Sequence, residues 1–184
     1  MTDEKLVEKT LEEHLIFDGR VITVYHNKAL LPNGETAMRE IVAHPGGVCI
    51  AALTEEKELL FVRQFRSPYG EIVTELPAGK LEKGEDPLKA GIRELSEETG
   101  ATAQKIVSLG KLYPTPGYCG EIIHMYLATG LSFGDQHTDD DEFLDVLRIP
   151  LDKAVGMVMA DELRDSKTQT AVLKVARLVE AGEI

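Results

Sequence analysis

One segment of this sequence, residues 79–101, carries the start and stop signals of a single helix. Asp86 can cap the free N–H groups of a first helical turn, and Pro87 suits the first helical position. Gly100 stands where a residue in the left-handed conformation would end the helix. The sequence therefore predicts one helix that begins at Pro87 and stops at Gly100.

The residues of this helix divide between two faces. At 100° per residue, Leu88, Ile92 and Leu95 fall within about 40° of one another, which predicts a buried stripe. Three carboxylates fall on an arc of about 100° on a different face, which we expect to be exposed: Glu94, Glu97 and Glu98. Carboxylates this close repel one another unless a cation neutralises them, and hard divalent cations prefer such oxygen clusters. The alternative is a solvated acidic face.

Arg93 lies one turn before Glu97, and a forked hydrogen bond could hold that carboxylate in place. Glu85 precedes the helix, where the helix dipole favours a negative charge. We therefore assign Arg93 a catalytic supporting role and Glu85 a structural one.

The same segment resembles the Nudix box, which reads Gly, five residues, Glu, seven residues, then Arg-Glu-apolar-x-Glu-Glu-x-Gly-apolar. All seven fixed positions are present, and the last apolar position holds the small Ala101. Seven specified positions arise by chance about once in 10⁸ windows or less. The resemblance implies a Nudix hydrolase, which cleaves a diphosphate linked to another moiety with divalent metal held by the box glutamates.

Segments outside the box resemble the ADP-ribose pyrophosphatase branch of this family. They are the Pro116-Gly117 pair, the segments 61–68 and 75–79, and the acidic run before Phe143. The resemblance implies hydrolysis of ADP-ribose to AMP and ribose 5-phosphate, and a homodimer that exchanges its N-terminal strands. It also implies two or three Mg²⁺ ions, with Mn²⁺ as the alternative, held by Glu94, Glu97, Glu98 and the Ala78 carbonyl.

The acidic run 139–142 is a second candidate for chemistry. Its simplest interpretation is a solvated loop, the commonest fate of a charge run. The family resemblance implies that an acid here deprotonates or orients the attacking water. Glu142, directly before Phe143, matches this role best, and Asp140 is the second choice.

Three further residues match positions that contact substrate in the family, and Phe17 is a fourth candidate for substrate contact. Arg39 and Arg66 would grip phosphate oxygens, for which planar guanidinium groups are well suited. Glu121 would contact a ribose, and Phe17 could stack on adenine. The alternatives are a surface or interface salt bridge for each arginine and a place in the core for Phe17.

The remaining pattern predicts an α/β protein with the Nudix fold, in which a mixed β-sheet is layered between helices. Residues 1–45 read as an antiparallel strand region involved in dimerisation, and residues 46–184 as the catalytic domain. Asn33-Gly34 supplies a hairpin turn in the first region. The expected strands are 12–17, 21–31, 36–42, 48–53, 58–64, 71–76, 105–112 and 122–129, with an amphipathic C-terminal helix that includes residues 171–179.

Charge and composition limit the classes of molecule that this protein is expected to bind. The net charge of −12 argues against a nucleic-acid backbone as the main partner. The sequence has no apolar run of 18 or more residues, so we expect no membrane insertion. Cys49 and Cys119 make no disulfide framework and fit a reducing cytoplasm. These observations favour a cytoplasmic enzyme for a small nucleotide-sugar substrate.

Two alternatives stay open. The first keeps the fold and changes the substrate to another nucleoside diphosphate sugar or a dinucleotide. The second is a metal-free Nudix-like module that binds a nucleotide without cleaving it. Such modules generally lose box acids, whereas this chain has all of them.

Overall fold

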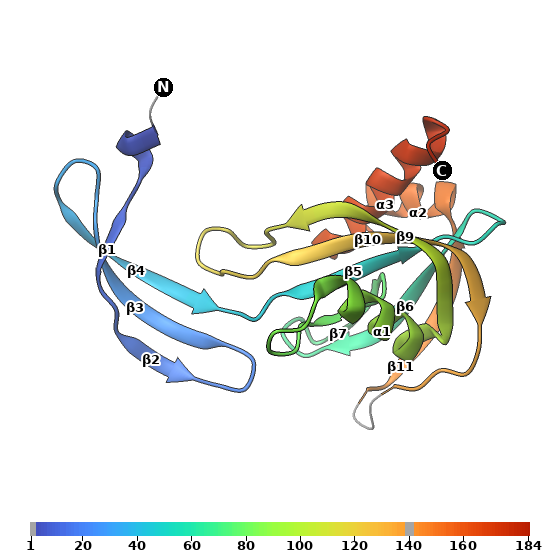
Figure 1. The fold of residues 1–184 in the computed structure, drawn as a ribbon, viewed down its shortest axis with the longest axis horizontal. Coiled ribbons are helices and arrows are strands. Elements are labelled where there is room, and N and C mark those ends of the chain that lie inside the picture. Colours follow the sequence, from blue (N-terminus) through green and yellow to red (C-terminus); the bar gives the residue numbers. More distant parts are fainter. Residues whose placement is uncertain (1–2, 139–141) are drawn as a thin grey trace. The chain divides into compact units, whose positions relative to one another are not determined.

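The computed structural model describes residues 3–138 and 142–184 (Figure 1). The chain divides into two compact units. Unit 1 comprises Met1–Gly46 and Tyr113–Ile122, and unit 2 comprises Gly47–Leu112 and Ile123–Ile184. Segment Tyr113–Ile122 therefore joins the N-terminal strands although it follows the box in sequence.

Unit 1 is built on one antiparallel sheet. Its elements are the 3₁₀ turn η1 (Asp3–Leu6) and the strands β1 (Lys9–Glu12), β2 (Leu15–Asp18), β3 (Thr23–Leu30) and β4 (Thr36–Ala43). β3 pairs with β1, β2 and β4, in each case antiparallel. The predicted hairpin turn is present: Gly34 has φ of +87°, and its N–H donates to the Leu31 carbonyl at 2.9 Å.

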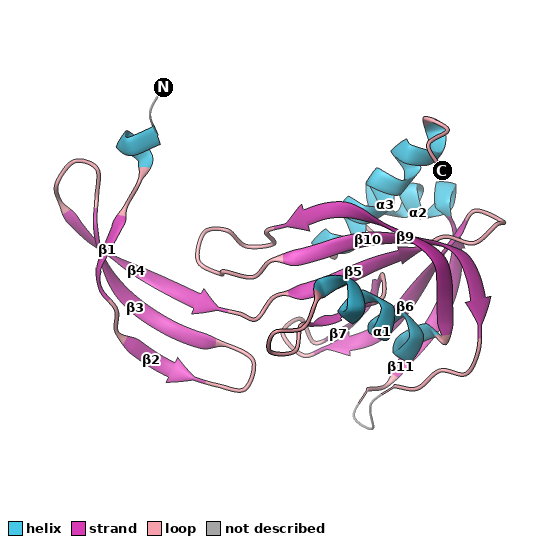
Figure 2. Cartoon of the chain, viewed as in Figure 1, coloured by secondary structure: helices cyan, strands magenta, loops and turns pink. Residues whose placement is uncertain are grey.

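The described residues of unit 2 form two sheets and three helices (Figure 2). Its strands are β5 (Gly47–Ala52), β6 (Glu58–Arg66), β7 (Glu71–Glu75), β8 (Ala78–Lys80), β9 (Ala101–Leu112), β10 (Ile123–Phe133) and β11 (Leu144–Pro150). Its helices are α1 (Pro87–Thr99), α2 (Leu151–Met159) and α3 (Ser166–Glu180). One sheet has the order β8-β5-β10-β9, with β5 and β10 parallel, and the other has the order β11-β6-β7.

The core of unit 2 forms on both sides of β5. Strand alternation sends Cys49 and Ala51 into a cluster with α3 residues such as Val172. Ile50 belongs instead to a cluster that includes Leu95 of α1. A mixed sheet with helices on both faces is therefore present, and the predicted α/β class is confirmed.

Within the part of the chain that the structure describes, none of the helices combines the length and the apolar character needed to cross a bilayer.

Candidate active site

The box helix α1 begins and ends where the sequence predicts. The Asp86 side chain accepts hydrogen bonds from the N–H groups of Leu88 and Lys89, each at 3.1 Å. Pro87 occupies the first turn. Gly100 has φ of +67°, and its N–H donates to the Ser96 carbonyl at 2.8 Å. Local capping chemistry therefore fixes the helix ends.

The predicted division of α1 into a buried apolar stripe and an exposed acidic arc is wrong. Leu88 and Ile92 are 39% and 47% exposed, whereas Glu94 and Glu98 are only 8% and 2% exposed. Leu95 alone of the predicted stripe is buried. The reason is tertiary: the small residues Ala90 and Gly91 lie on the same buried face as the glutamates, and protein partners satisfy these carboxylates.

Arg93 contacts three carboxylates at once. Its forked pair of hydrogen bonds goes to Glu85, from Nε to Oε1 at 3.1 Å and from Nη2 to Oε2 at 3.2 Å. Nη1 lies 2.8 Å from Glu97 Oε2 and 2.8 Å from Glu94 Oε1. The fork therefore binds Glu85 and not Glu97, because Glu85 approaches the guanidinium edge that carries two parallel donors. The hydrogen bonds with Glu85 are the first cause of the raised pKa of Arg93.

Glu98 is the most buried of the box glutamates on α1. Its Oε2 accepts a hydrogen bond from the Ala78 N–H at 3.0 Å. Burial raises the pKa of Glu98 to about 8, against the lowering effect of the Ala78 N–H. The negative charges of Glu94 and Glu142 raise it further. The structure thus brings together Ala78, Glu94, Glu98 and Glu142, all predicted as site residues.

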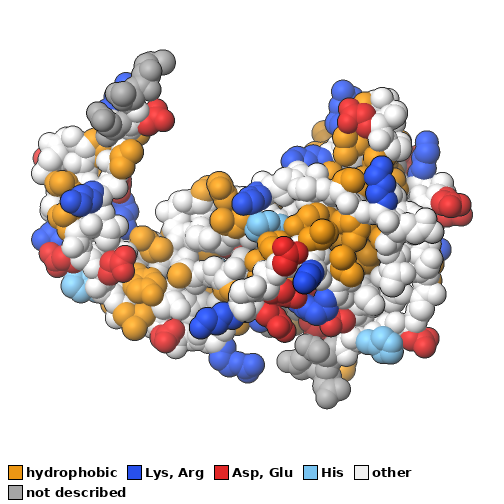
Figure 3. Space-filling model, viewed as in Figure 1, with side chains coloured by type: hydrophobic (Ala, Val, Ile, Leu, Met, Phe, Trp, Pro, Cys, Tyr) orange, Lys and Arg blue, Asp and Glu red, His pale blue; other side chains and the backbone are white. Residues whose placement is uncertain are grey.

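The pKa of Glu94 is also raised. Burial is the main cause that raises its pKa, Arg93 opposes the rise, and Glu97 and Glu142 add to it. Buried carboxylates that raise one another's pKa values are a common mark of functional sites. In Figure 3, acidic and basic side chains lie next to one another on the face over α1.

Gly79, the first residue of the box, is required by close packing. A Cβ atom at this position would lie 2.0 Å from Glu94 Oε1, much closer than any real contact. Any other residue would therefore displace the Glu94 carboxylate from its place against the β8 backbone.

Arg66 lies at the end of β6, where it forms a fork with Glu75. Its Nε and Nη2 donate to the two Glu75 oxygens at 2.6 and 2.9 Å. Glu75 is buried and also binds Lys167 of α3. The roles of Glu75 and Lys167 were not predicted. Glu75 stands in the 75–79 segment already noted, whereas nothing local in the sequence distinguishes Lys167.

The other predicted substrate residues lie in unit 1. Arg39 on β4 forks to Glu8 at 2.9 and 2.6 Å. Glu121 Oε1 lies 3.5 Å from His44 Nδ1. Phe17 on β2 is 55% exposed, which excludes a core position within this chain.

The second-choice base, Asp140, lies outside the described residues.

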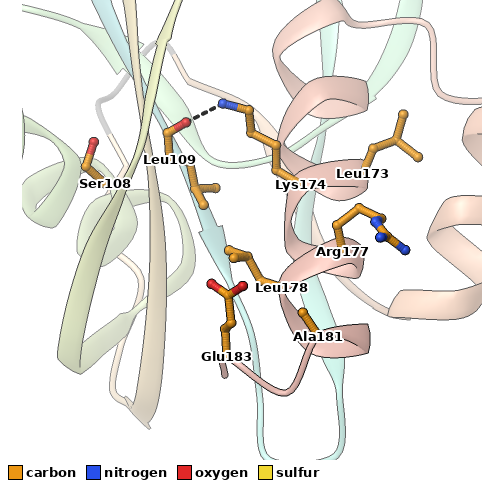
Figure 4. A pocket seen from close by; sticks show the side chains of 8 residues that line it. All are labelled: Ser108, Leu109, Leu173, Lys174, Arg177, Leu178, Ala181 and Glu183. Carbon is orange, nitrogen blue, oxygen red and sulfur yellow. Dashed lines mark hydrogen bonds between the residues drawn. The ribbon is translucent and has the colours of Figure 1, made fainter.

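A cavity of about 590 Å³ in unit 2 is lined by residues of β9, α3 and the C-terminal segment (Figure 4). Lys174 crosses it to donate to the Leu109 carbonyl at 2.5 Å. Its lining residues are Ser108, Leu109, Leu173, Lys174, Arg177, Leu178, Ala181 and Glu183. This cavity is therefore a different place from the box carboxylates.

Over residues 3–138 and 142–184, no group of three or more His, Cys, Asp or Glu side chains is already arranged as a metal-binding cluster. Arg93 and the Ala78 N–H take up oxygens of the box carboxylates in this structure. The donor set nevertheless suits a hard divalent cation, since it consists of carboxylate oxygens. Burial, and after it the neighbouring carboxylates, raises the pKa values of Glu94 and Glu98. The residues present therefore fit such an ion.

Comparison with known proteins supports the family assignment that the box suggests. A model of the NUDIX domain matches residues 43–170. The chain is 43% identical over 171 residues to an ADP-ribose pyrophosphatase of Bacillus subtilis (strain 168), covering 92% of each chain. It is 44% identical over 167 residues to a methanol dehydrogenase activator of Bacillus methanolicus, covering 90% of each chain.

A solved structure described as an ADP compounds hydrolase shares the fold, with a TM-score of 0.83 and 21% sequence identity. The alignment covers 96% of this chain and 97% of that one. The chain therefore belongs to the NUDIX family. The expectation of a Nudix pyrophosphohydrolase is confirmed at the level of family and enzyme class.

Proposed function

We propose that this protein hydrolyses the diphosphate bond of ADP-ribose to AMP and ribose 5-phosphate. The observation that carries the proposal is the pair of buried box carboxylates, Glu94 and Glu98, which lie beside the β8 backbone. Burial raises the pKa values of both, and the negative charge of Glu142 raises them further. The similarity to an ADP-ribose pyrophosphatase over 92% of both chains supports the choice of substrate.

We assign metal binding to Glu94, Glu97, Glu98 and the Ala78 carbonyl, with Mg²⁺ as the expected ion and Mn²⁺ as the alternative. A bound divalent ion would supply positive charge for the developing phosphate charge and lower the pKa of the attacking water. Arg93 holds Glu97 and Glu94 from one side, so these carboxylates keep a fixed orientation.

The protein's own groups then divide the work of hydrolysis. Glu142 accepts a proton from the attacking water, whose oxygen forms a bond to one phosphorus of the diphosphate. The bond from that phosphorus to the bridging oxygen breaks, and the departing phosphate keeps the electron pair. Arg66 and Arg39 bind the diphosphate or terminal phosphate oxygens, Glu121 contacts a ribose, and Phe17 stacks on adenine.

We also propose a cytoplasmic homodimer that exchanges its N-terminal strands. The exposed apolar side chains of β1 and β2 support this arrangement, because water is a costly environment for them. Cys49 and Cys119 are free thiols, which fits a reducing compartment.

The decisive experiment is a panel of diphosphate compounds assayed with Mg²⁺ and scored by kcat/KM. It should include ADP-ribose, a dinucleotide and a second nucleoside diphosphate sugar, because a relative of similar identity is named for activating another enzyme. We expect the highest kcat/KM for ADP-ribose. A preference for either other class would replace the proposed substrate, and binding without turnover would indicate a nucleotide-binding module.

A further inference from the structure

Four charged side chains beside the box form a closed cluster that joins three elements. Arg66 of β6 forks to Glu75 at the end of β7. Lys167 in the first turn of α3 binds the second Glu75 oxygen and lies 3.0 Å from Asp165 Oδ1. The Glu75 carboxylate therefore forms ion pairs with two cations, Arg66 and Lys167.

Lys167 is a buried charge. It is 8% exposed, and lysine is almost never buried unless paired. Burial lowers its pKa, but the carboxylates of Asp165 and Glu75 raise it more strongly, so the ammonium stays charged. A buried ion pair of this kind is weak evidence for stability, because desolvation offsets the attraction. Its placement beside Arg66 indicates a different use.

The backbone around Lys167 is fixed independently. Asp165 caps α3 with its Oδ2, which accepts from the Thr168 N–H at 2.9 Å, while its Oδ1 faces Lys167. Thr168 Oγ1 accepts from the Leu76 N–H at 2.9 Å. Two consecutive residues of α3 thus hold two consecutive residues of the segment that leads to Ala78 and the box.

The charges of this cluster balance. Arg66 and Lys167 are positive and Glu75 and Asp165 are negative, so the four formal charges cancel. Without Lys167 the cluster would carry one net negative charge, and Glu75 would have Arg66 as its remaining cation. A cluster with net negative charge repels an anionic diphosphate. In addition, the positive charge of Arg66 would be neutralised by Glu75 alone, so less of it would be available to a phosphate.

We propose that Lys167 is a positioning residue for substrate binding: by neutralising and fixing Glu75, it holds Arg66 in place with its charge available to the diphosphate. This role rests on the proposed function, in which Arg66 binds phosphate. Lys167 does not touch the substrate and acts through Glu75.

A double-mutant cycle tests this role. Lys167→Met should raise KM for ADP-ribose about tenfold and leave kcat within about a factor of two, and we expect the same of Arg66→Ala. Because both changes remove the same interaction, adding Lys167→Met to Arg66→Ala should raise KM no further. Lys174→Met is the matched control: it removes another α3 ammonium, which binds the Leu109 carbonyl, and should leave KM unchanged.

The other outcomes would overturn the proposal. An unchanged KM in Lys167→Met, or an equal rise of KM in the Arg66→Ala background, would show that Lys167 does not act through Arg66. If Lys167→Met does not fold, Lys167→Gln keeps a donor of similar size without the charge. Failure of both variants to fold would assign Lys167 to the core and overturn its role in binding.

The same assays separate this proposal from the proposed function. If the wild-type protein does not hydrolyse ADP-ribose, the proposed function fails, and the cycle is repeated with the diphosphate compound of the panel that it does hydrolyse. If the wild-type protein hydrolyses ADP-ribose and Lys167→Met retains its KM, only the role of Lys167 fails.

Discussion

The two units of this protein use their apolar residues in opposite ways. In unit 2 all six residues of β5 are buried, and helices pack on both sides of them. In unit 1 every residue of β1 and β2 is exposed. The large apolar side chains that unit 1 exposes are Leu6, Val7, Leu11, Leu15, Ile16, Phe17, Val21, Met38, Tyr113 and Tyr118.

The difference shows that backbone pairing can define a sheet in which the apolar side chains of two strands, β1 and β2, stay unburied within their own unit. Burying one large apolar side chain contributes about 1.5–3 kcal/mol, a gain that β1 and β2 forgo in the single chain. The proposed second copy would recover it. We therefore expect substitutions in unit 2 to affect catalysis or substrate binding, and substitutions in unit 1 to affect association or substrate binding.

The largest effect should come from the acid expected to activate water in unit 2. Glu142→Gln should lower kcat by about 10²–10⁴-fold with little change in KM, since a general base acts in the transition state. Steady-state kinetics with ADP-ribose measure this, and Asp145→Asn, an exposed acid on β11, is the control. A fully active Glu142→Gln beside a crippled Asp140→Asn would move the base by two residues.

The next effect should appear in unit 1. Leu15 is 58% exposed on β2, so Leu15→Glu would place a charge in the proposed interface. We expect the Kd of the dimer to rise by about 10–100-fold, from the lost burial of one apolar side chain. Sedimentation velocity over a range of concentrations measures it, with Met159→Glu in unit 2 as the control. A monomeric wild-type protein would remove the explanation given for the exposed strands.

The third effect concerns the charge of Glu98 without metal. Its pKa of about 8 in the folded protein lies above the ordinary value of 4.5, so folding binds a proton. The stabilisation from this proton is complete below about pH 4.5 and is lost as pH rises to about 8. In chelator, Glu98→Gln should therefore gain stability relative to wild type between pH 5 and pH 8.5.

We expect this relative gain to be about 4 kcal/mol, or roughly 8–16 °C in Tm for a chain of this size. Thermal unfolding followed by circular dichroism measures it at both pH values. Adding Mg²⁺ at pH 8.5 should stabilise the wild type more than the variant. Parallel pH curves for the two proteins would contradict the raised pKa of Glu98.

The smallest effect should come from Arg39 in unit 1. Arg39→Ala should raise KM for ADP-ribose about tenfold with kcat nearly unchanged, because a phosphate contact is made before the reaction begins. Arg20→Ala, another exposed arginine of unit 1, is the control. If KM is the same in both variants, the ion pair of Arg39 with Glu8 is only a surface contact.

Local chemistry was the part of this molecule that sequence patterns could predict. Asp86, Pro87 and Gly100 fix the ends of α1 through contacts within a few residues, and the prediction was confirmed. Helix α2 was not predicted, and the single strand expected over residues 12–17 is interrupted between β1 and β2.

The faces of α1 could not be predicted from periodicity alone. Hydrophobic periodicity assumes that apolar residues decide which face is buried. Here Glu94 and Glu98 are buried because Arg93 and the Ala78 N–H satisfy them, and Gly79 leaves room for the Glu94 carboxylate. The link between Lys167 and Glu75 spans 92 residues and has no local pattern to reveal it.

The hydrogen bond from the Leu76 N–H to Thr168 can form only after most of the chain has been synthesised. The two residues are 92 positions apart, so a ribosome adding about 5–20 residues per second needs roughly 5–18 s to pass from one to the other. Once Ala101 has been added, the nascent chain contains the whole box but still lacks the helix turn that holds Glu75 and Leu76. A chain clipped before Lys167 would therefore carry every box glutamate and lack the α3 contacts that hold Glu75 and Leu76.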